Sequence, residues 1–248
     1  MDRALLLQFD VLENTHWWFV VRRRLVMTLA AQWAPIETKR IIEIGCGTGG
    51  TLRSLQFAFP SASVGGIEPV EVAAELCRSR GSDVVVASME DLPDPDESAD
   101  LMLALDVIEH LENDVAGLAE VRRVLRPGGR VILTVPALPS LWGPHDVANA
   151  HFRRYTRRTL VRAVTDAGLS VERVSFFNAI LLPAGWLERQ VTRILRLRWS
   201  LGVGQPPRPM NAVMRGLFGL ELPILKRLDL PVGMSLVLVA SKPQREKG

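Results

Sequence analysis

The sequence predicts a doubly wound α/β domain with a mostly parallel sheet, and three observations support this fold class. Short apolar segments alternate with helical segments through the first half of the chain. The first apolar segment ends in a glycine-rich loop that opens into a helix. The chain has 248 residues, of which 48% are hydrophobic and 23% charged, so it can bury one such domain and is too short for two. Strands that alternate with helices at this spacing form a parallel sheet covered on both faces.

The first 136 residues give the clearest pattern. Residues 1–35 are expected to be helical, with an aromatic run at 17–19 ahead of a basic run at 22–24. A core follows in which helices end at Pro60 and at Gly81, residues that break helices or close them. The strands expected in this core are 41–44, 63–67, 84–87, 101–105 and 130–135, with helices over 50–59, 70–80 and 114–125.

After Pro136 the alternation weakens. A helix is expected over 156–167 and a strand over 169–177, followed by a helical region, 181–230, rich in Pro, Leu and Arg. A last apolar strand is expected over 235–240. The two late strands suit an antiparallel hairpin at the edge of the sheet. The chain is therefore divided into a helical cap (1–35), a ligand-binding core (36–136) and additions that include the last strands (137–248).

Composition limits the cellular context and the partners. The only two cysteines, Cys46 and Cys77, cannot form a disulfide framework, so a reducing compartment and a cytoplasmic location are expected. The N-terminal apolar run, Ala4 to Leu7, is too short for a signal peptide or a membrane span. The net charge is only +3 and the arginines are scattered, so no nucleic-acid partner is expected.

The glycine loop after the first strand is the strongest local signal of a binding site. Glycines at 45, 47 and 49 allow sharp backbone turns and close approach of a ligand at the carboxyl edge of the sheet. Glu68 ends the second strand, where its carboxylate can accept two hydrogen bonds from a ribose. Gly45, Gly47 and Gly50 also satisfy the spacing of dinucleotide-binding loops, so two ligands remain open. Glu43 and Gly49 favour a nucleoside methyl donor.

Several segments together resemble one family. IIEIGCGTGG resembles the first motif of class I S-adenosylmethionine-dependent methyltransferases, and GIEPVE resembles the second. SMEDLPDPDESADLMLALDVIEHLEND is similar to the third and fourth motifs, and VRRVLRPGGRVILTVP to the fifth and sixth. The resemblance covers about residues 40–136 in the family's order. It implies a seven-stranded sheet with an antiparallel last strand, and S-adenosylmethionine as cofactor.

Carried over by motif, the resemblance assigns a set of cofactor-binding positions. Glu43 and the loop Gly45, Cys46, Gly47 and Gly49 would line the methionine part, Glu68 would hold the ribose, and Pro69 would lie beside the adenine. Ser88 and Met89 would lie at the adenine edge, and Leu105 with Asp106 beneath the sulfonium. Many relatives have Asp at the position of Ser88, so the adenine contact here is expected from the backbone N–H of Met89. Between its flanking glycines, Cys46 itself is interpreted as structural.

The candidates for catalysis follow the fourth and fifth expected strands, whose carboxyl ends meet at one edge. His110 and His151 are the expected catalytic residues, because an alcohol or phenol acceptor gains from a general base. Other candidates in the same two segments are Asp106, Glu109, His145, Asp146 and Tyr155. The stretch HFRRYT and the pattern HWWF…RR resemble bacterial methyltransferases associated with glycan, lipid or secondary-metabolite modification. That resemblance implies a helical lid over the cleft, with Arg22 or Arg23 near the cofactor carboxylate.

A metal ion is an alternative for the same segment. Clusters similar to Asp106-x-x-Glu109-His110, with Glu at the first position, bind a divalent ion in ubiquinone-type O-methyltransferases and small-RNA 2′-O-methyltransferases. Here the first residue is Asp, and a fourth ligand would have to come from a residue such as His145 or His151. We therefore expect no metal, and expect His110 to act as a base or to orient the acceptor.

Three functions remain in competition. The leading one is methylation, at oxygen, of a small molecule, a saccharide or a lipid-linked acceptor. A nicotinamide-dependent oxidoreductase is less favoured, because Tyr155 is not followed by the lysine of a Tyr-x-x-x-Lys pair. A non-catalytic binding module is the third. Residues 176–199 are interpreted as a lid or as a peripheral membrane contact, and the sequence determines neither the acceptor nor the oligomeric state.

Overall fold

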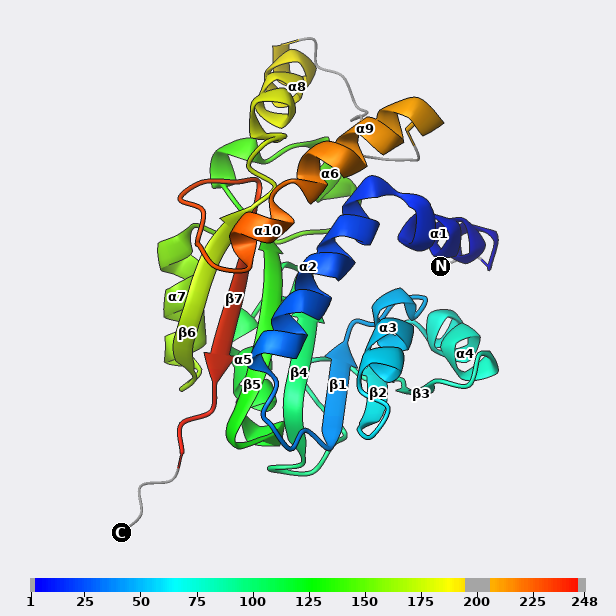
Figure 1. The fold of residues 1–248 in the computed structure, drawn as a ribbon, viewed down its shortest axis with the longest axis vertical. Helices are drawn as coiled ribbons and strands as arrows, with labels where there is room; N and C mark the ends of the chain where they lie inside the picture. Colours follow the sequence, from blue (N-terminus) through cyan, green and yellow to red (C-terminus); the bar gives the residue numbers. More distant parts are fainter. Residues whose placement is uncertain (1–2, 195–205, 245–248) are drawn as a thin grey trace.

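The computed structural model describes residues 3–194 and 206–244 and is built on a seven-stranded sheet (Figure 1). The strand order is β3-β2-β1-β4-β5-β7-β6, and β7 runs in the opposite direction to the other six strands. This confirms the predicted fold class. The strands are β1 (Arg40–Ile44), β2 (Ser63–Ile67), β3 (Asp83–Val85), β4 (Ala99–Leu105), β5 (Leu125–Pro136), β6 (Ser170–Phe177) and β7 (Ser235–Ser241).

Two hydrophobic clusters cover the two faces of the sheet, because side chains alternate along each strand. Ile41 joins one cluster and Ile42 the other. The first cluster packs α2 (Trp17–Trp33), α3 (Gly50–Ala58), α4 (Glu71–Ser79) and α9 (Arg208–Gly219) against one face. The second packs α5 (Asp114–Val124) and α7 (Arg157–Asp166) against the other. Every residue of β4 is buried, as expected for a central strand of a covered parallel sheet.

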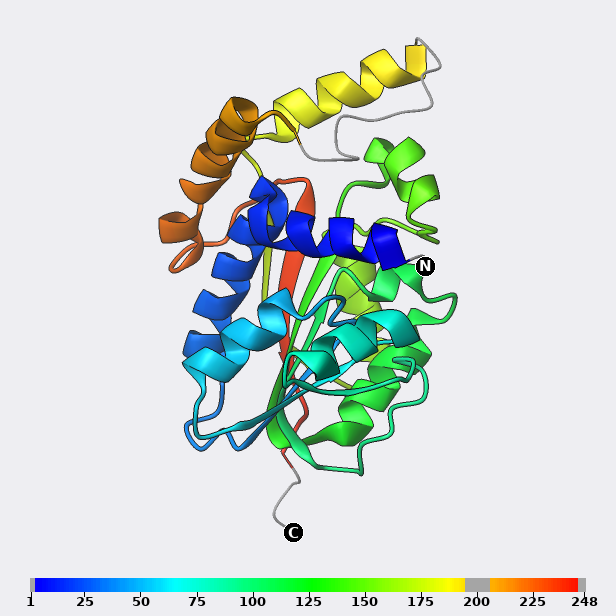
Figure 2. The ribbon, with the colours of Figure 1, turned by 90° about the vertical axis from the view of Figure 1, so that its right-hand side faces the viewer.

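Additional helices gather at the carboxyl end of the parallel strands (Figure 1). Figure 2 shows α1 (Arg3–Thr15) lying across this end above α3 and α4. The short elements η1 (Ile108–His110), η2 (Pro139–Leu141) and α6 (Pro144–Ala148) follow β4 and β5 there. The helices α8 (Leu182–Ile194) and α10 (Leu222–Leu225) complete this group. The carboxyl edge is therefore the part of the sheet over which a ligand site can form.

The observed elements differ from the predicted ones at a few places. The N-terminal helical region is divided at His16, whose side chain accepts a hydrogen bond from Trp18 N (3.3 Å) and begins α2. Strand β5 begins at Leu125 and not at 130: Leu125 pairs with Ala99 of β4 and Arg130 with Leu101, so the register shifts between the two pairs. The predicted hairpin pairs as expected, with β7 inserted between β5 and β6. Part of the helical region 181–230 lies outside the described residues; the rest forms α8, α9 and α10. Among the described helices, none is long and apolar enough to cross a membrane.

Candidate functional site

The glycine loop connects the end of β1 to the start of α3 with three residues in the left-handed region. Gly45, Gly47 and Gly49 have φ values of 67°, 55° and 82°. A Cβ added at Gly45 would lie 2.7 Å from Val107 Cγ2, whereas at Gly47 the nearest atom would be 3.8 Å away. Gly45 N donates to Ile67 O (2.7 Å), which fixes the loop to the end of β2. Gly45 and Gly47 are half-buried and carry no Cβ, so a ligand can approach their backbone closely.

Cys46 packs inside the domain, in keeping with its interpretation as a structural residue. Its side chain is buried beside Cys77, and a Cβ added at Gly66 would come within 2.7 Å of its sulfur. A hydrogen bond to Cys77, together with burial, raises the pKa of the Cys46 thiol. A thiol held in its neutral form is a poor nucleophile, so Cys46 contributes packing to the loop.

Glu68 lies at the end of β2, as predicted, and holds the glycine loop. One carboxylate oxygen accepts Gly47 N (2.8 Å) and the other accepts Val70 N (3.0 Å). Burial raises the pKa of Glu68, and the two N–H groups oppose that shift. Each carboxylate oxygen has a second lone pair, so Glu68 can accept ribose hydroxyls while it holds the loop. Its assignment to the ribose stays a prediction.

The expected adenine-edge residues follow β2 and β3. Pro69 is exposed, and so is Ser88, whose Oγ accepts Glu90 N (3.3 Å). Met89 is 3% exposed and packs toward Gly117 of α5, where an added Cβ would lie 3.3 Å from its Cγ. The Met89 side chain therefore belongs to the core.

Glu13, on α1, is a residue that sequence analysis missed. Its Oε2 accepts hydrogen bonds from the Thr48 hydroxyl and from Gly50 N (3.2 Å), at the N-terminus of α3. Asp10, one turn earlier, forms two hydrogen bonds with Arg80 of α4 (2.6 and 2.9 Å). An acidic residue in the N-terminal helix gives no sequence signal of its own, because only the folded chain brings α1 over the loop.

Glu43 is almost completely buried beneath this loop. It is 3% exposed, and its Oε2 has no hydrogen-bond partner among the described residues. Burial and the nearby Glu13 raise the pKa of Glu43 well above its usual value. A buried carboxyl group without a partner is costly, so this position fits a polar or cationic group supplied by a ligand.

Asp106 ends β4 with a left-handed φ of 57° and is paired with Arg22 of α2. Its other oxygen accepts the Thr134 hydroxyl (3.2 Å). Arg22 Nη1 also lies 3.4 Å from Leu105 O, so this arginine is fixed at the end of β4. Arg23 instead faces the glycine loop: a Cβ added at Gly50 would lie 2.5 Å from its Nη1. Of the two arginines expected near a cofactor carboxylate, Arg23 is the better placed.

His110 and His151 come together, although they are distant in the sequence. Their ring centroids lie 4.7 Å apart at an interplanar angle of 84°. His151 Nδ1 lies 3.1 Å from Asp146 Oδ1, and that oxygen also accepts Arg154 Nε (2.7 Å). Burial raises the pKa of Asp146, but the hydrogen bonds from His151 and Arg154 hold it at about 2. An ionised Asp146 therefore orients the His151 ring.

The neighbouring candidates separate into two groups. Glu109 joins the histidines: one ligand atom from each of Glu109, His110 and His151 lies within 4.8 Å of the others. Neither Glu109 oxygen has a hydrogen-bond partner among the described residues, and burial raises its pKa well above the usual value. Tyr155 does not join, because its hydroxyl is buried 2.6 Å from Asp114 Oδ2. The structure therefore does not support Tyr155 as a reactive group.

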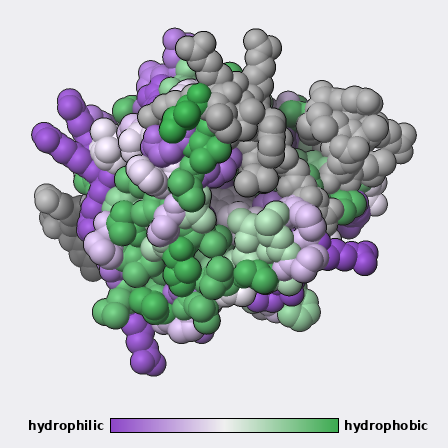
Figure 3. Space-filling model, turned by 90° about the horizontal axis from the view of Figure 1, so that it is seen from above, coloured by the Kyte–Doolittle hydropathy of each residue, from purple (hydrophilic) through white to green (hydrophobic). Residues whose placement is uncertain are grey.

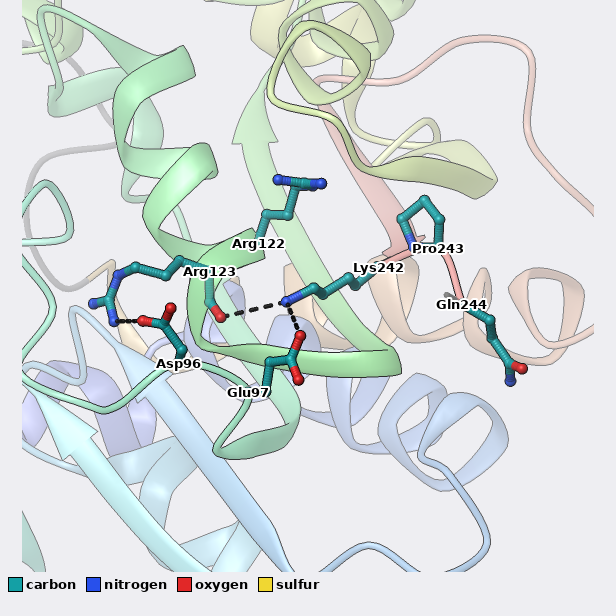
Figure 4. Close-up of a pocket in the computed structure, with 7 residues that line it drawn as sticks. All are labelled: Asp96, Glu97, Arg122, Arg123, Lys242, Pro243 and Gln244. Atoms are coloured by element: carbon teal, nitrogen blue, oxygen red, sulfur yellow. Dashed lines mark hydrogen bonds and ion pairs between the residues drawn. The ribbon is translucent and has the colours of Figure 1, made fainter. Parts of the chain in front are cut away.

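A hollow at the opposite end of the sheet is not a second candidate site, because both of its acids are paired with cations and Arg122 Nε donates to Gly168 O (3.1 Å) (Figure 4). Arg123 Nη1 lies 2.7 Å from Asp96 Oδ1, and Lys242 Nζ lies 3.3 Å from Glu97 Oε1. These pairs join the start of β4, the end of α5 and the end of β7. They are interpreted as structural ties.

Comparison with known proteins identifies the core. Residues 42–133 match the model of the methyltransferase domain family. A fatty-acid O-methyltransferase of Mycolicibacterium smegmatis is 36% identical over 115 residues, which cover 45% of this chain and 42% of that protein. A phthiotriol/phenolphthiotriol dimycocerosates methyltransferase of Mycobacterium ulcerans is 37% identical over 131 residues, covering 50% and 48%. The chain thus spans less than half the length of these curated relatives.

A solved structure shares the fold. Geranyl diphosphate C-methyltransferase of Streptomyces coelicolor, in complex with Mg²⁺, geranyl diphosphate and S-adenosyl-L-homocysteine, aligns with a TM-score of 0.58 at 19% identity. The alignment covers 90% of this chain and 79% of that one. Residues 42–133 thus form a methyltransferase domain, and the strand order of the sheet is the one expected for the class I S-adenosylmethionine-dependent fold.

The first prediction concerns the backbone of the glycine loop. Gly45→Ala should lower the free energy of unfolding by about 1–3 kcal/mol, because a Cβ is disfavoured at positive φ and would meet Val107. The matched control is Gly216→Ala, inside α9 and with open space around it, which should raise stability by about 0.5–1 kcal/mol. Urea unfolding measures both variants. Equal effects of the two substitutions would contradict the loop geometry.

Proposed function

We propose that this chain is a class I methyltransferase that transfers the methyl group of S-adenosylmethionine to an oxygen atom of a small molecule, a saccharide or a lipid-linked acceptor. The observation that carries the proposal is that the glycine loop and the His110–His151 cluster open at the same carboxyl edge of the sheet. The fatty-acid and phthiotriol methyltransferases among the relatives support an acceptor of lipid or small-molecule character.

The residues present fit the cofactor. No Cβ covers the half-buried backbone at Gly47, and Glu43 has a buried oxygen that no described residue bonds and that could receive a polar group of the methionine part. Glu68 would hold the ribose, with Pro69, Ser88 and the backbone of Met89 along the adenine. Leu105 and Asp106 would lie beside the sulfur. When bound, S-adenosylmethionine supplies an activated methyl group to the acceptor oxygen.

His110 is proposed to take the proton from the acceptor hydroxyl, and His151 to hold the acceptor or His110 in place. Burial, followed by the neighbouring His151, lowers the pKa of His110. The ring is therefore neutral at pH 7, as a general base must be. Asp146 and Arg154 fix the second ring, so little rearrangement is needed when an acceptor enters.

Ligand binding provides the direct test of the proposed function. Thermal unfolding of the whole chain should shift upward with S-adenosylmethionine and S-adenosylhomocysteine, because a ligand that binds only the folded state stabilises it. NAD should give no shift. A shift with NAD alone would support an oxidoreductase instead, and binding without methyl transfer to any acceptor in a labelled-methyl screen would favour a binding module.

Loss of the Glu68 carboxylate should weaken cofactor binding. We expect Glu68→Ala to cost about 1.5–3 kcal/mol of binding free energy, the range for hydrogen bonds to a charged group. Glu71→Ala, an exposed acid at the start of α4, is the matched control. Isothermal titration calorimetry with S-adenosylhomocysteine compares the two, and equal affinities would show that the ribose lies elsewhere.

The pH dependence should report His110. Because the pKa of His110 is lowered, kcat/KM should be level at pH 7 and above, and should fall only below about pH 6.5, as the base becomes protonated. A carboxylate titrates at a lower pH than an imidazole, so replacing His110 by Glu or Asp should move the pH at which kcat/KM falls. His110→Gln should reduce kcat by about 10²–10⁴-fold. An unchanged kcat in this variant would argue against His110 as the base.

Metal dependence needs its own test, because Glu109, His110 and His151 could each offer one ligand atom. We expect methyl transfer to continue after chelator treatment and to be unaffected by added Mg²⁺. Asp106 is paired with Arg22, which leaves one carboxylate and two imidazoles, whereas Mg²⁺ prefers oxygen ligands. Activity that disappears with the chelator and returns with the metal would show that this expectation is wrong.

A further inference from the structure

An apolar stripe runs along the outer side of α9 and continues past α10. Its residues are three or four positions apart, the spacing that places side chains on one side of a helix. The stripe consists of Met210, Val213, Leu217, Leu220, Ile224 and Leu228, and each is between 37% and 65% exposed.

The inner side of α9 packs against the hydrophobic core. Phe218 is fully buried and stacks on Trp18 of α2 with ring centroids 5.6 Å apart, and Met214 packs in the same cluster. The stripe lies next to this buried side, about 100° further around the helix, and Arg208, Asn211 and Arg215 occupy the polar side. The apolar surface of α9 is therefore wider than the part that packs on the domain, and its outer part is left exposed.

Helix α8 adds a second exposed apolar row. Leu187, Val191 and Ile194 are 58%, 41% and 76% exposed, and Trp186 is 52% exposed. Seen from above the carboxyl end of the sheet, apolar residues gather over a broad part of this face (Figure 3). Large exposed apolar patches mark contacts with a partner or a membrane.

The charges around the stripe are mostly positive, and the exposed acid that follows it, Asp229, is paired with Arg173 (2.7 Å). Between residues 206 and 228 the exposed charged side chains are Arg208, Arg215, Lys226 and Arg227. The acid in this stretch, Glu221, is 1% exposed, and its Oε1 accepts Ile180 N (2.8 Å). The surface beside the apolar stripe is thus cationic.

A hollow next to α10 increases this positive charge. Arg23 and Arg24 of α2 line it together with Lys226, the apolar Leu222 and the hydroxyl-bearing Thr28 and Ser54. No acidic residue lines the hollow, and within residues 3–194 and 206–244 none of its three cations forms an ion pair. A hollow of this composition suits a phosphate group with an apolar neighbour.

We propose that this face docks on a lipid bilayer that contains anionic phospholipids. The apolar rows of α8 and α9 enter the boundary between head groups and acyl chains, and the hollow beside α10 receives a lipid phosphate. Interfacial helices combine an apolar side with Lys and Arg in this way. A second copy of the chain fits less well, because a twofold dimer would bring the same cations against one another. The docking does not depend on the proposed methyl transfer.

Vesicle co-sedimentation with the full chain tests the proposal. The protein should bind vesicles of phosphatidylcholine with phosphatidylglycerol, and should bind pure phosphatidylcholine weakly. The double variant Arg24→Gln, Lys226→Gln should weaken binding at low salt by about fivefold for each lost charge. Its matched control is Arg157→Gln, Arg158→Gln, which removes two exposed charges from the start of α7. Binding to the mixed vesicles should also decrease as salt is raised.

The apolar contribution is tested separately. Leu217→Ser with Leu220→Ser should reduce binding to mixed vesicles by more than about tenfold, since each leucine contributes apolar area to the contact. Phe57→Ser on α3, at a side chain that is 89% exposed, is the control. Circular dichroism and affinity for S-adenosylhomocysteine should be unchanged in all variants, which separates this proposal from the proposed function.

Two outcomes would overturn the proposal. One is equal binding of wild type, the stripe variant and the charge variant to the mixed vesicles. The other is a wild-type dimer in light scattering that the stripe variant converts to monomer without any change in vesicle binding, which would assign the apolar face to a second copy.

Discussion

The loops at the carboxyl edge of the sheet are held in place by carboxylates that accept hydrogen bonds or pair with cations. Parallel strands end at one edge, so acids that follow different strands are brought together there. Glu68 is held by two backbone N–H groups, and Asp106 by Arg22. Asp146 is held by Arg154 and His151. Each of these acids also fixes a loop, and the loops form the walls of the site.

Two other carboxylates at this edge, Glu43 and Glu109, have oxygens without a hydrogen-bond partner among the described residues. Within residues 3–194 and 206–244, Glu43 keeps one oxygen without a hydrogen bond and Glu109 keeps two, and both residues are buried. Glu43 lies in β1, the strand that leads into the glycine loop, while Glu109 lies beside His110 and His151. Because unsatisfied buried polar groups are rare in folded proteins, these two positions mark where ligands are expected to complete the structure. They correspond to the donor side and the acceptor side of the proposed reaction.

The sequence predicted the sheet and the loop well, because both depend on local patterns. Apolar segments between Gly and Pro determine the strands, and Gly45, Gly47 and Gly49 are needed for positive φ. The pairing of His110 with His151 was also predictable, since the loops after β4 and β5 end at one edge. The hydrogen-bond and ion-pair partners of individual side chains were not predictable. Neither the pairing of Asp106 with Arg22 nor the position of Glu13 over the loop follows from any local pattern, because α1 and α2 reach these places only through tertiary packing.

The N-terminal helices connect these features to the outer surface. One side of α2 carries Arg22, which holds the end of β4, and its next residue, Arg23, reaches both the glycine loop and the hollow beside α10. Trp18 of the same helix stacks on Phe218 of α9. Any force on α9 from a bound surface would therefore act on the helix that positions Arg22 and Arg23. The helix α2 thus contacts the glycine loop, the end of β4 and α9. The proposed docking face and the proposed cofactor site are therefore connected through a single helix.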